Sequence, residues 1–373
     1  MIYKKLIRPA LFERDPEEIH DRVIRILRSA SDTAGLYGFL KMVCNVCDGR
    51  LKQELFGLTF RNPVGLAAGM DKGGTALLAW EMLGFGFVEI GGITALKQLG
   101  NPEPRIFRVP EEEALINRMG FNNPGAEETA YHLGVVRKPS VPLFINIGLS
   151  KAVPVDDMEA VVHDYCYTLN KLYEYADAFV VNVSSPNTLN LRRLQGKEFL
   201  RILLKGIQRQ NLKVSRRPDE RLKPILLKIS PDLTFQEIDE ILEVIGDVGI
   251  DGIVAVNTTT KRDELKTTSV AVNEIGGLSG RPLRWRALEI VAYIHKKFPS
   301  LPIVGVGGIF SGEDAYRMIY AGASLVQICT GLVYEGPGLA RRINKTLLAF
   351  MSVKLDGIGP VSVSNLNQVV NRL

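Results

Sequence analysis

Eight short apolar segments recur along this chain, and each is followed by turn residues and then by a stretch of helical character. Their hydrophobicity is nearly continuous rather than strictly alternating, which is typical of parallel strands buried on both faces. Eight β-then-α units predict an α/β fold closed as a (β/α)8 TIM barrel. A doubly wound open sheet also alternates strand and helix, but it usually has fewer strands and a glycine-rich fingerprint that this sequence lacks. The predicted strands cover residues 63–67, 87–91, 143–147, 179–183, 225–229, 253–256, 303–306 and 325–329.

Composition narrows the class of protein further. The chain is 46% hydrophobic and 23% charged, so a disordered protein is excluded, and its 373 residues allow a barrel with an extension. A net charge of +5 is too small to demand a nucleic-acid partner, and we expect none. The four cysteines cannot form a disulfide framework, and the lone pair Cys44 and Cys47 lacks the further ligands of a zinc site. We therefore expect an intracellular protein without a metal.

The first 50 residues do not belong to the repeat, and we expect them to form a helical element, residues 1–50, in front of a barrel domain, residues 51–373. Asp15 is placed to cap a helix whose first residue is Pro16. The second segment, residues 36–46, is apolar over most of its circumference and should bury that surface in protein, lipid or a ligand. No run of 18 apolar residues is present, so no membrane-spanning helix is expected.

Two longer segments, residues 92–142 and 192–223, allow further structural predictions. Residues 92–142 should hold an inserted loop beside the site as well as a helix. Residues 192–223 contain 11 basic and 3 acidic side chains. This stretch is either a surface for RNA or membrane or a solvated outer helix, and the solvated helix is favoured.

Polar and glycine residues gather after the predicted strands, where barrels place their active sites. Lys72 and Lys228 are deep lysines that need an anion nearby, although a Schiff-base role for Lys228 is an alternative. Gly307 and Gly308 suit a phosphate, and the cluster 276–280, expected just after the sixth helix begins, would add to the same site. Amide side chains suit a planar ligand with alternating donors and acceptors. The amides are Asn117, Asn146, Asn182, Asn187 and Asn257.

Four motifs together resemble the class 2 dihydroorotate dehydrogenases. They are Ala67-Ala-Gly-Met-Asp-Lys72, Ile116-Asn-Arg-Met-Gly-Phe-Asn-Asn123, Val181-Asn-Val-Ser-Ser-Pro-Asn187 and Gly276-Gly-Leu-Ser-Gly-Arg-Pro282. The similarity covers nearly the whole chain, including the N-terminal helices, which in this family form the mouth of a quinone tunnel and rest on the membrane. The soluble class 1 enzymes have a cysteine where this sequence has Ser185, which indicates class 2.

The resemblance implies FMN across the barrel mouth, with dihydroorotate stacked on it. Ser185 would be the catalytic base that removes a proton from C5 while hydride passes from C6 to the flavin. His20 and Arg108 match positions in the quinone tunnel. The implied substrate contacts are Lys72, Asn117, Arg118, Met119, Gly120, Phe121, Asn182, Asn187, Asn257 and Thr258. The implied cofactor contacts are Ala68, Gly69, Met70, Asp71, Lys72, Gly92, Asn146, Asn182, Lys228, Val256, Gly280, Gly308, Cys329 and Thr330.

Three positions depart from the family pattern. Gly92 stands where the family usually has threonine or serine, Cys329 where it often has tyrosine, and residues 146–151 differ from the common Gly-Lys-Asn-Lys ending. A flavin contact and the inner end of the quinone tunnel are the features affected.

The expected activity is therefore oxidation of dihydroorotate to orotate in pyrimidine biosynthesis, with electrons passing to a membrane quinone. Two alternative hypotheses are a flavin barrel acting on uracil in RNA and a membrane module without activity. No transit segment precedes the helices, so we expect peripheral association with the cytoplasmic side of a bacterial cell membrane.

Overall fold

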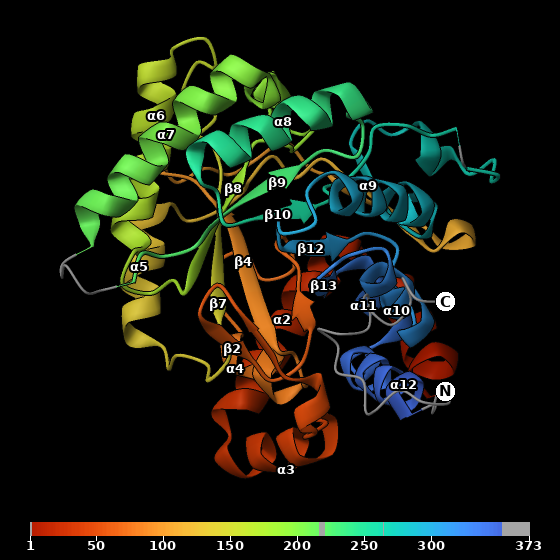
Figure 1. The fold of residues 1–373 in the computed structure, drawn as a ribbon. Helices are drawn as coiled ribbons and strands as arrows, with labels where there is room; N and C mark the ends of the chain where they lie inside the picture. The colour runs from red at the N-terminus through yellow and green to blue at the C-terminus, as the bar shows by residue number, and fades with distance from the viewer. Residues whose placement is uncertain (1, 216–220, 264, 353–373) are drawn as a thin grey trace.

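The computed structural model describes residues 2–215, 221–263 and 265–352. Eight parallel strands close into a barrel in the order β10-β12-β13-β3-β4-β7-β8-β9 (Figure 1). The predicted barrel is confirmed, and each predicted strand overlaps an observed one. The barrel strands are β3 (Val64–Leu66), β4 (Phe87–Ile93), β7 (Leu143–Ile147), β8 (Ala178–Asn182), β9 (Ile225–Ile229), β10 (Gly252–Ala255), β12 (Ile303–Val306) and β13 (Leu325–Ile328).

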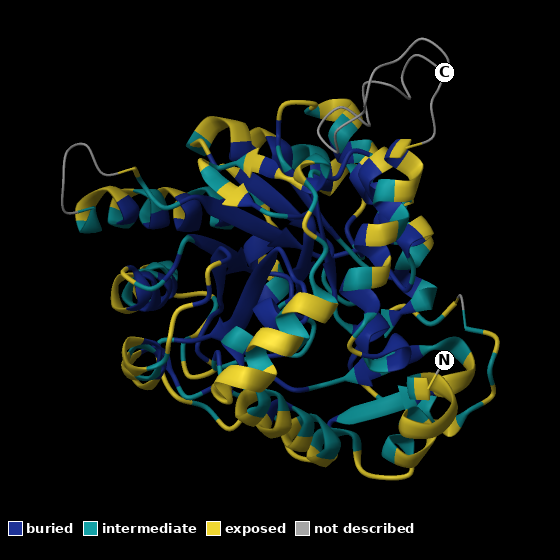
Figure 2. Cartoon of the chain, turned by 90° about the horizontal axis from the view of Figure 1, so that it is seen from below, coloured by how far each residue is buried: buried dark blue, intermediate teal, exposed yellow. Residues whose placement is uncertain are grey.

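A helix follows each barrel strand and packs on the outside of the barrel, as Figure 2 shows by the buried strands at its centre. Local sequence explains where these helices begin and end: Thr234 and Glu237 form a capping box at the start of α8, and Gly249 ends it in the left-handed conformation. The outer helices are α4 (Leu77–Met82), α5 (Ala126–Val135), α6 (Met158–Leu172), α7 (Lys197–Val214), α8 (Phe235–Val248), α9 (Arg284–Lys297), α10 (Gly312–Tyr320), α11 (Thr330–Glu335) and α12 (Leu339–Ser352). Short turns of helix are η2 (Gly49–Leu51), η3 (Pro110–Glu112), η4 (Leu191–Gln195), η5 (Val270–Asn273) and η6 (Arg281–Leu283).

The interior of the barrel has an apolar layer at the amino-terminal ends of its strands. Phe87 and Phe144 pack there with centroids 5.2 Å apart, and Phe60 meets both rings edge-on. Phe60 comes from a two-stranded hairpin, β1 (Gln53–Leu55) and β2 (Leu58–Phe60), that the sequence analysis missed. This hairpin packs against the apolar layer, so ligands have access at the opposite end.

The N-terminal residues form η1 (Tyr3–Ile7), α1 (Arg8–Phe12), α2 (Pro16–Asp32) and α3 (Ala34–Cys44). Asp15 caps α2 by accepting from the backbone N–H groups of Glu17 and Glu18 at 2.9 Å, as predicted. Figure 1 shows α3 beside α2 and α4, outside the ring of barrel helices. Large apolar side chains of this region remain exposed: Ile2, Leu6, Ile7, Ile26, Leu36, Phe39, Met42 and Val43. Within the described part of the chain, no helix is both long enough and apolar enough to cross a bilayer.

The interval 92–142 contains α5, as expected, but its insertion is a β-hairpin, β5 (Ile106–Val109) and β6 (Ala114–Asn117). The hairpin pairs with β11 (Gly277–Gly280) in a three-stranded sheet. The expected position of the glycine cluster 276–280 was therefore wrong, because these residues form a strand before α9 rather than a turn after a helix begins.

Most of the basic stretch 192–223 forms the outer helix α7, as favoured, with residues 216–220 outside the described part. Its amino-terminal half faces carboxylates of α8, since Lys197 pairs with Glu243 at 2.7 Å and Arg201 with Asp247 at 2.9 Å. These pairs neutralise part of the charge that an RNA surface would use.

Candidate active site

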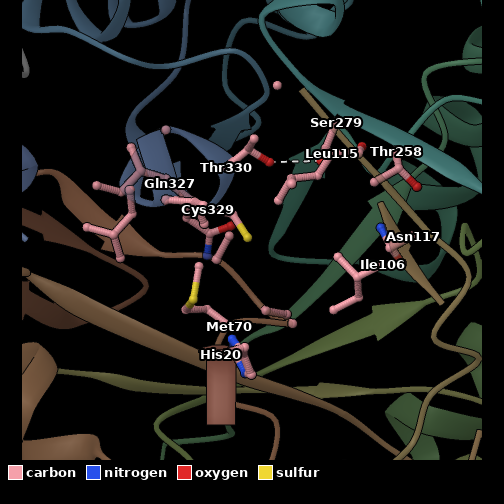
Figure 3. A pocket seen from close by; sticks show the side chains of 18 of the residues that line it. His20, Met70, Ile106, Leu115, Asn117, Thr258, Ser279, Gln327, Cys329 and Thr330 are labelled. Atoms are coloured by element: carbon pink, nitrogen blue, oxygen red, sulfur yellow. Dashed lines mark hydrogen bonds between the residues drawn. The ribbon is translucent and has the colours of Figure 1, made fainter. Parts of the chain in front are cut away.

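A cavity of about 500 Å³ lies at the carboxyl ends of the barrel strands and extends to the N-terminal helices (Figure 3). Loops that follow the strands bring most of the predicted site residues to its wall. These are His20, Ala68, Gly69, Met70, Lys72, Gly92, Arg108, Asn117, Met119, Gly120, Phe121, Asn182, Ser185, Asn187, Lys228, Val256, Asn257, Thr258, Gly280, Gly308, Cys329 and Thr330.

Three of the predicted site residues are not part of this wall. Asp71 accepts hydrogen bonds from the backbone of Thr75 and Ala76 and from the Trp80 indole, so its carboxylate orders the turn into α4. Arg118 pairs with Glu274 at 2.5 Å. Asn146 is fully buried behind Asn182.

The predicted asparagines meet in two hydrogen-bonded groups. Asn187 donates to the Asn117 side chain at 3.1 Å, across the boundary between the fourth barrel unit and β6. Asn182 donates to Asn146 at 2.9 Å and accepts from Asn257 at 3.3 Å. Four of the five amides line the cavity, all except Asn146, and they come from β6, from β8 and the loop after it, and from the loop after β10.

Ser185 lies on the loop after β8 and is 7% exposed. Its hydroxyl oxygen accepts from the backbone N–H of Asn187 at 3.3 Å. This bond fixes the loop but leaves the hydroxyl proton without a protein acceptor among the described residues, so the group faces the cavity as a potential proton carrier.

The two lysines have different surroundings. Lys228 lies 3.6 Å from Glu89, a fully buried carboxylate inside the barrel. Lys72 makes no hydrogen bond or ion pair with any described residue, and burial lowers its pKa to about 8 despite the carboxylate of Glu17. An anionic ligand would supply the partner that Lys72 lacks.

Glu89 and Gln327, which lie inside β4 and β13, were not among the predicted site residues. Both are buried, and Gln327 donates to Glu89 at 2.5 Å. The signal was the position of each residue, two residues after an inward-facing apolar residue (Phe87 or Leu325). This signal is weak because the surrounding residues of both strands are apolar.

A polar cluster that was not predicted from the sequence connects the loops of the site by hydrogen bonds. Arg192 donates to the carbonyl groups of Ser184 at 3.1 Å and Thr258 at 2.9 Å, and it pairs with Asp232 at 2.7 Å. Asp232 in turn accepts from Thr260. Arg192 belongs to the basic stretch, so one residue of that stretch supports the site rather than facing solvent.

The departure at Gly92 has a steric explanation. A Cβ atom at Gly92 would lie 2.7 Å from the Phe121 ring and 3.1 Å from the amide oxygen of Asn146. A Cβ atom at Gly148 would lie 2.8 Å from the opposite edge of the same ring. The Phe121 ring therefore fills the space into which a side chain at position 92 would extend.

The part of the cavity predicted to bind a phosphate is formed by residues from β11 and from the segments after β12 and β13. Thr330 donates to the Ser279 hydroxyl at 2.8 Å, and Figure 3 shows this bond beside the cavity. Gly280 and Gly308 lie on the same wall. Gly308 has φ of +66°, and a Cβ atom there would lie 2.6 Å from the backbone of Arg284, so only glycine fits.

The other side of the cavity is apolar and comes from the N-terminal helices. Its apolar lining includes Tyr3, Ile7, Leu11, Phe12, Ile19, Val23, Ile24 and Leu27. Arg108 holds this region by donating to the carbonyl groups of Phe12 at 3.2 Å and Arg14 at 2.6 Å. Burial, followed by the positive charge of Lys72, lowers the pKa of His20, so its neutral form is favoured.

A barrel with a polar, amide-lined cavity at the carboxyl ends of its strands is an enzyme scaffold suited to a planar, hydrogen-bonding ligand. Comparison with known proteins specifies the enzyme family. The sequence model of the family described as "Dihydroorotate dehydrogenase" matches residues 50–351. The chain therefore belongs to the dihydroorotate dehydrogenase family and is an enzyme of that family.

Individual relatives agree with this assignment. A protein of Christiangramia forsetii named dihydroorotate dehydrogenase (quinone) is 47% identical over 93% of this chain and 99% of its own length. One of Chloroflexus aurantiacus with the same name is 46% identical over 95% of this chain and 98% of its own. The ligand-free crystal structure of the Eimeria tenella enzyme superposes with a TM-score of 0.84 at 34% identity, covering 96% of this chain and all of that one.

Proposed function

We propose that this enzyme oxidises dihydroorotate to orotate, uses FMN as its cofactor, and passes the electrons to a quinone at the cytoplasmic face of a cell membrane. The observation that carries the proposal is a single cavity with an amide- and lysine-lined side at the barrel mouth and an apolar side formed by the N-terminal helices. The name dihydroorotate dehydrogenase (quinone), shared by the relatives, supports both the oxidation of dihydroorotate and the reduction of a quinone.

The residues present fit FMN. The amide oxygen of Gln327, on the cavity wall, is buried without a hydrogen-bond partner among the described residues, as expected where a ligand donor belongs. Lys228 and Asn182 would hold the flavin ring, and Gly280, Gly308 and Thr330 its phosphate. FMN bound there supplies the hydride acceptor.

The substrate side follows from the chain's own groups. Lys72 would bind the carboxylate of dihydroorotate, since it is otherwise unpaired among the described residues. Asn117, Asn187 and Asn257 would orient the pyrimidine ring through its alternating donors and acceptors. Ser185 would then take the C5 proton while its own hydroxyl proton passes to a water molecule, in a site shielded from bulk water.

The purified protein is therefore expected to be yellow, and its flavin absorbance should bleach when dihydroorotate is added without oxygen. Ser185→Ala should slow bleaching by about 10²- to 10⁴-fold because the proton acceptor is lost. Ser185→Cys, which restores an ionisable group, should recover part of the rate. A colourless protein, or a Ser185→Ala variant that bleaches at the wild-type rate, would contradict the proposal.

A further inference from the structure

A layer of polar side chains lies inside the barrel, between the apolar layer and the cavity. It contains Glu89 from β4, Asn146 from β7, Lys228 from β9 and Gln327 from β13. Glu89 has no exposed surface and does not line the cavity, whereas Lys228 and Gln327 do. A carboxylate in such a place is costly unless it is paired and hydrogen-bonded, so its presence calls for a reason.

Both oxygens of Glu89 are occupied. One accepts from the Asn146 amide at 2.7 Å, and the other accepts from the Gln327 amide at 2.5 Å. The Lys228 ammonium lies 3.6 Å from the first oxygen. Within the described part of the chain, Lys228 is the cation paired with this carboxylate.

The hydrogen bonds to Glu89 determine which way the neighbouring amides point. A carboxylate only accepts, so Asn146 must turn its NH₂ group toward Glu89 and its oxygen toward Asn182. Asn182 then donates to Asn146 at 2.9 Å and presents its own oxygen to Asn257 and Ser184. The order of donors and acceptors along this part of the cavity wall therefore starts at Glu89.

We propose that Glu89 is a positioning residue for the oxidation reaction: it balances the charge of Lys228 and sets the orientation of Asn146, Asn182 and Gln327 from behind the cavity. The inference rests on the proposed function because Lys228 and Asn182 are the groups assigned to the flavin. Glu89 itself touches neither ligand. Its effect reaches the site through the ion pair with Lys228 and through the hydrogen bonds that link the side-chain amides.

Glu89→Gln tests this role because it keeps the size of the side chain and removes the charge. We expect the purified variant to bind flavin with a higher midpoint reduction potential, since the positive charge of Lys228 beside the ring is no longer balanced. We also expect kcat for dihydroorotate to fall about tenfold, in the range seen when outer-shell partners are removed at metal sites. Glu89→Asp, which keeps the charge, should restore the potential toward the wild-type value.

Glu81→Gln is the matched control, because Glu81 is also a buried carboxylate but lies in α4 outside the cavity wall. It should lower thermal stability without changing the flavin potential. An unchanged potential and kcat in Glu89→Gln, or equal changes in both variants, would overturn the role of Glu89. A wild-type protein that binds no flavin would instead contradict the proposed function.

Discussion

At the scale of single residues, Lys72 shows how burial prepares a group for a ligand. Lys72 lies on the cavity wall, and burial lowers its pKa to about 8, with the carboxylate of Glu17 opposing the shift. The side chain therefore keeps its proton at neutral pH but loses it within a mildly alkaline range. A bound carboxylate would favour the charged form.

Orotate binding should consequently weaken as pH rises through 8, because the protonated lysine is the form that attracts the carboxylate. We expect the dissociation constant, followed by the change in flavin absorbance, to increase about tenfold between pH 7 and 9. Lys72→Arg should bind with little change over this range, since arginine stays charged. Equal pH dependence in both proteins would rule out Lys72 as the group responsible.

At the scale of elements, the attachment of α3 depends on a buried carboxylate in α4. Glu81 accepts from Lys41 of α3 at 2.5 Å and from the backbone and hydroxyl of Ser140 at 2.8 and 2.7 Å. Burial by itself would raise the pKa of Glu81, but these hydrogen bonds outweigh burial and hold the pKa at about 2. The ionised carboxylate therefore stabilises the docked helix.

Because the folded pKa of Glu81 lies below its unfolded value, the stabilisation is complete above about pH 4.5 and is lost as pH falls toward 2. Glu81→Gln should lower the free energy of unfolding by about 1–3 kcal/mol at pH 7. The difference in Tm between wild type and variant should shrink as pH is lowered from 4.5. A difference that stays constant down to pH 3 would show that the charge of Glu81 is not involved.

At the scale of the whole molecule, the N-terminal helices contribute both to the wall of the cavity and to an exposed apolar surface. Helices α1 and α2 line the cavity with their apolar residues, and α3 leaves Phe39 57% and Met42 74% exposed. The apolar surface of α3 was predicted to be buried in protein, lipid or a ligand, and the protein itself leaves part of this surface uncovered. Under the proposed function at a membrane, lipid would cover this surface.

Replacing Phe39 and Met42 together by glutamine should reduce binding to phospholipid vesicles at least tenfold, because each side chain contributes about 1.5–3 kcal/mol when buried. Turnover with a long-chain quinone in vesicles should fall with it, while turnover with a soluble dye should not. Leu212→Gln on α7, where leucine is 62% exposed, is the matched control. If the dye reaction fell as much as the quinone reaction, the double variant would have disturbed the barrel instead.

Much of the site was predictable because the barrel brings the ends of its strands to one rim. Once eight parallel strands are recognised, Lys72, Asn182, Ser185 and Lys228 must approach one another even though they are far apart in sequence. The insertion was harder, because the pairing of β6 with β11 joins residues about 160 positions apart and leaves no local periodic signal. The same pairing explains why the glycine cluster was placed wrongly.

The sequence by itself determined the number and order of the barrel strands, the cap of α2 and the family, since these depend on local patterns and on motifs. Only the tertiary structure decided that Glu89 pairs with Lys228, that Phe121 occupies the space beside Gly92, and that Asp71 faces α4 rather than the cavity. The physical reason is that burial and charge pairing depend on contacts between residues of different strands and loops. A residue's own neighbours in the chain do not specify what it meets across the barrel.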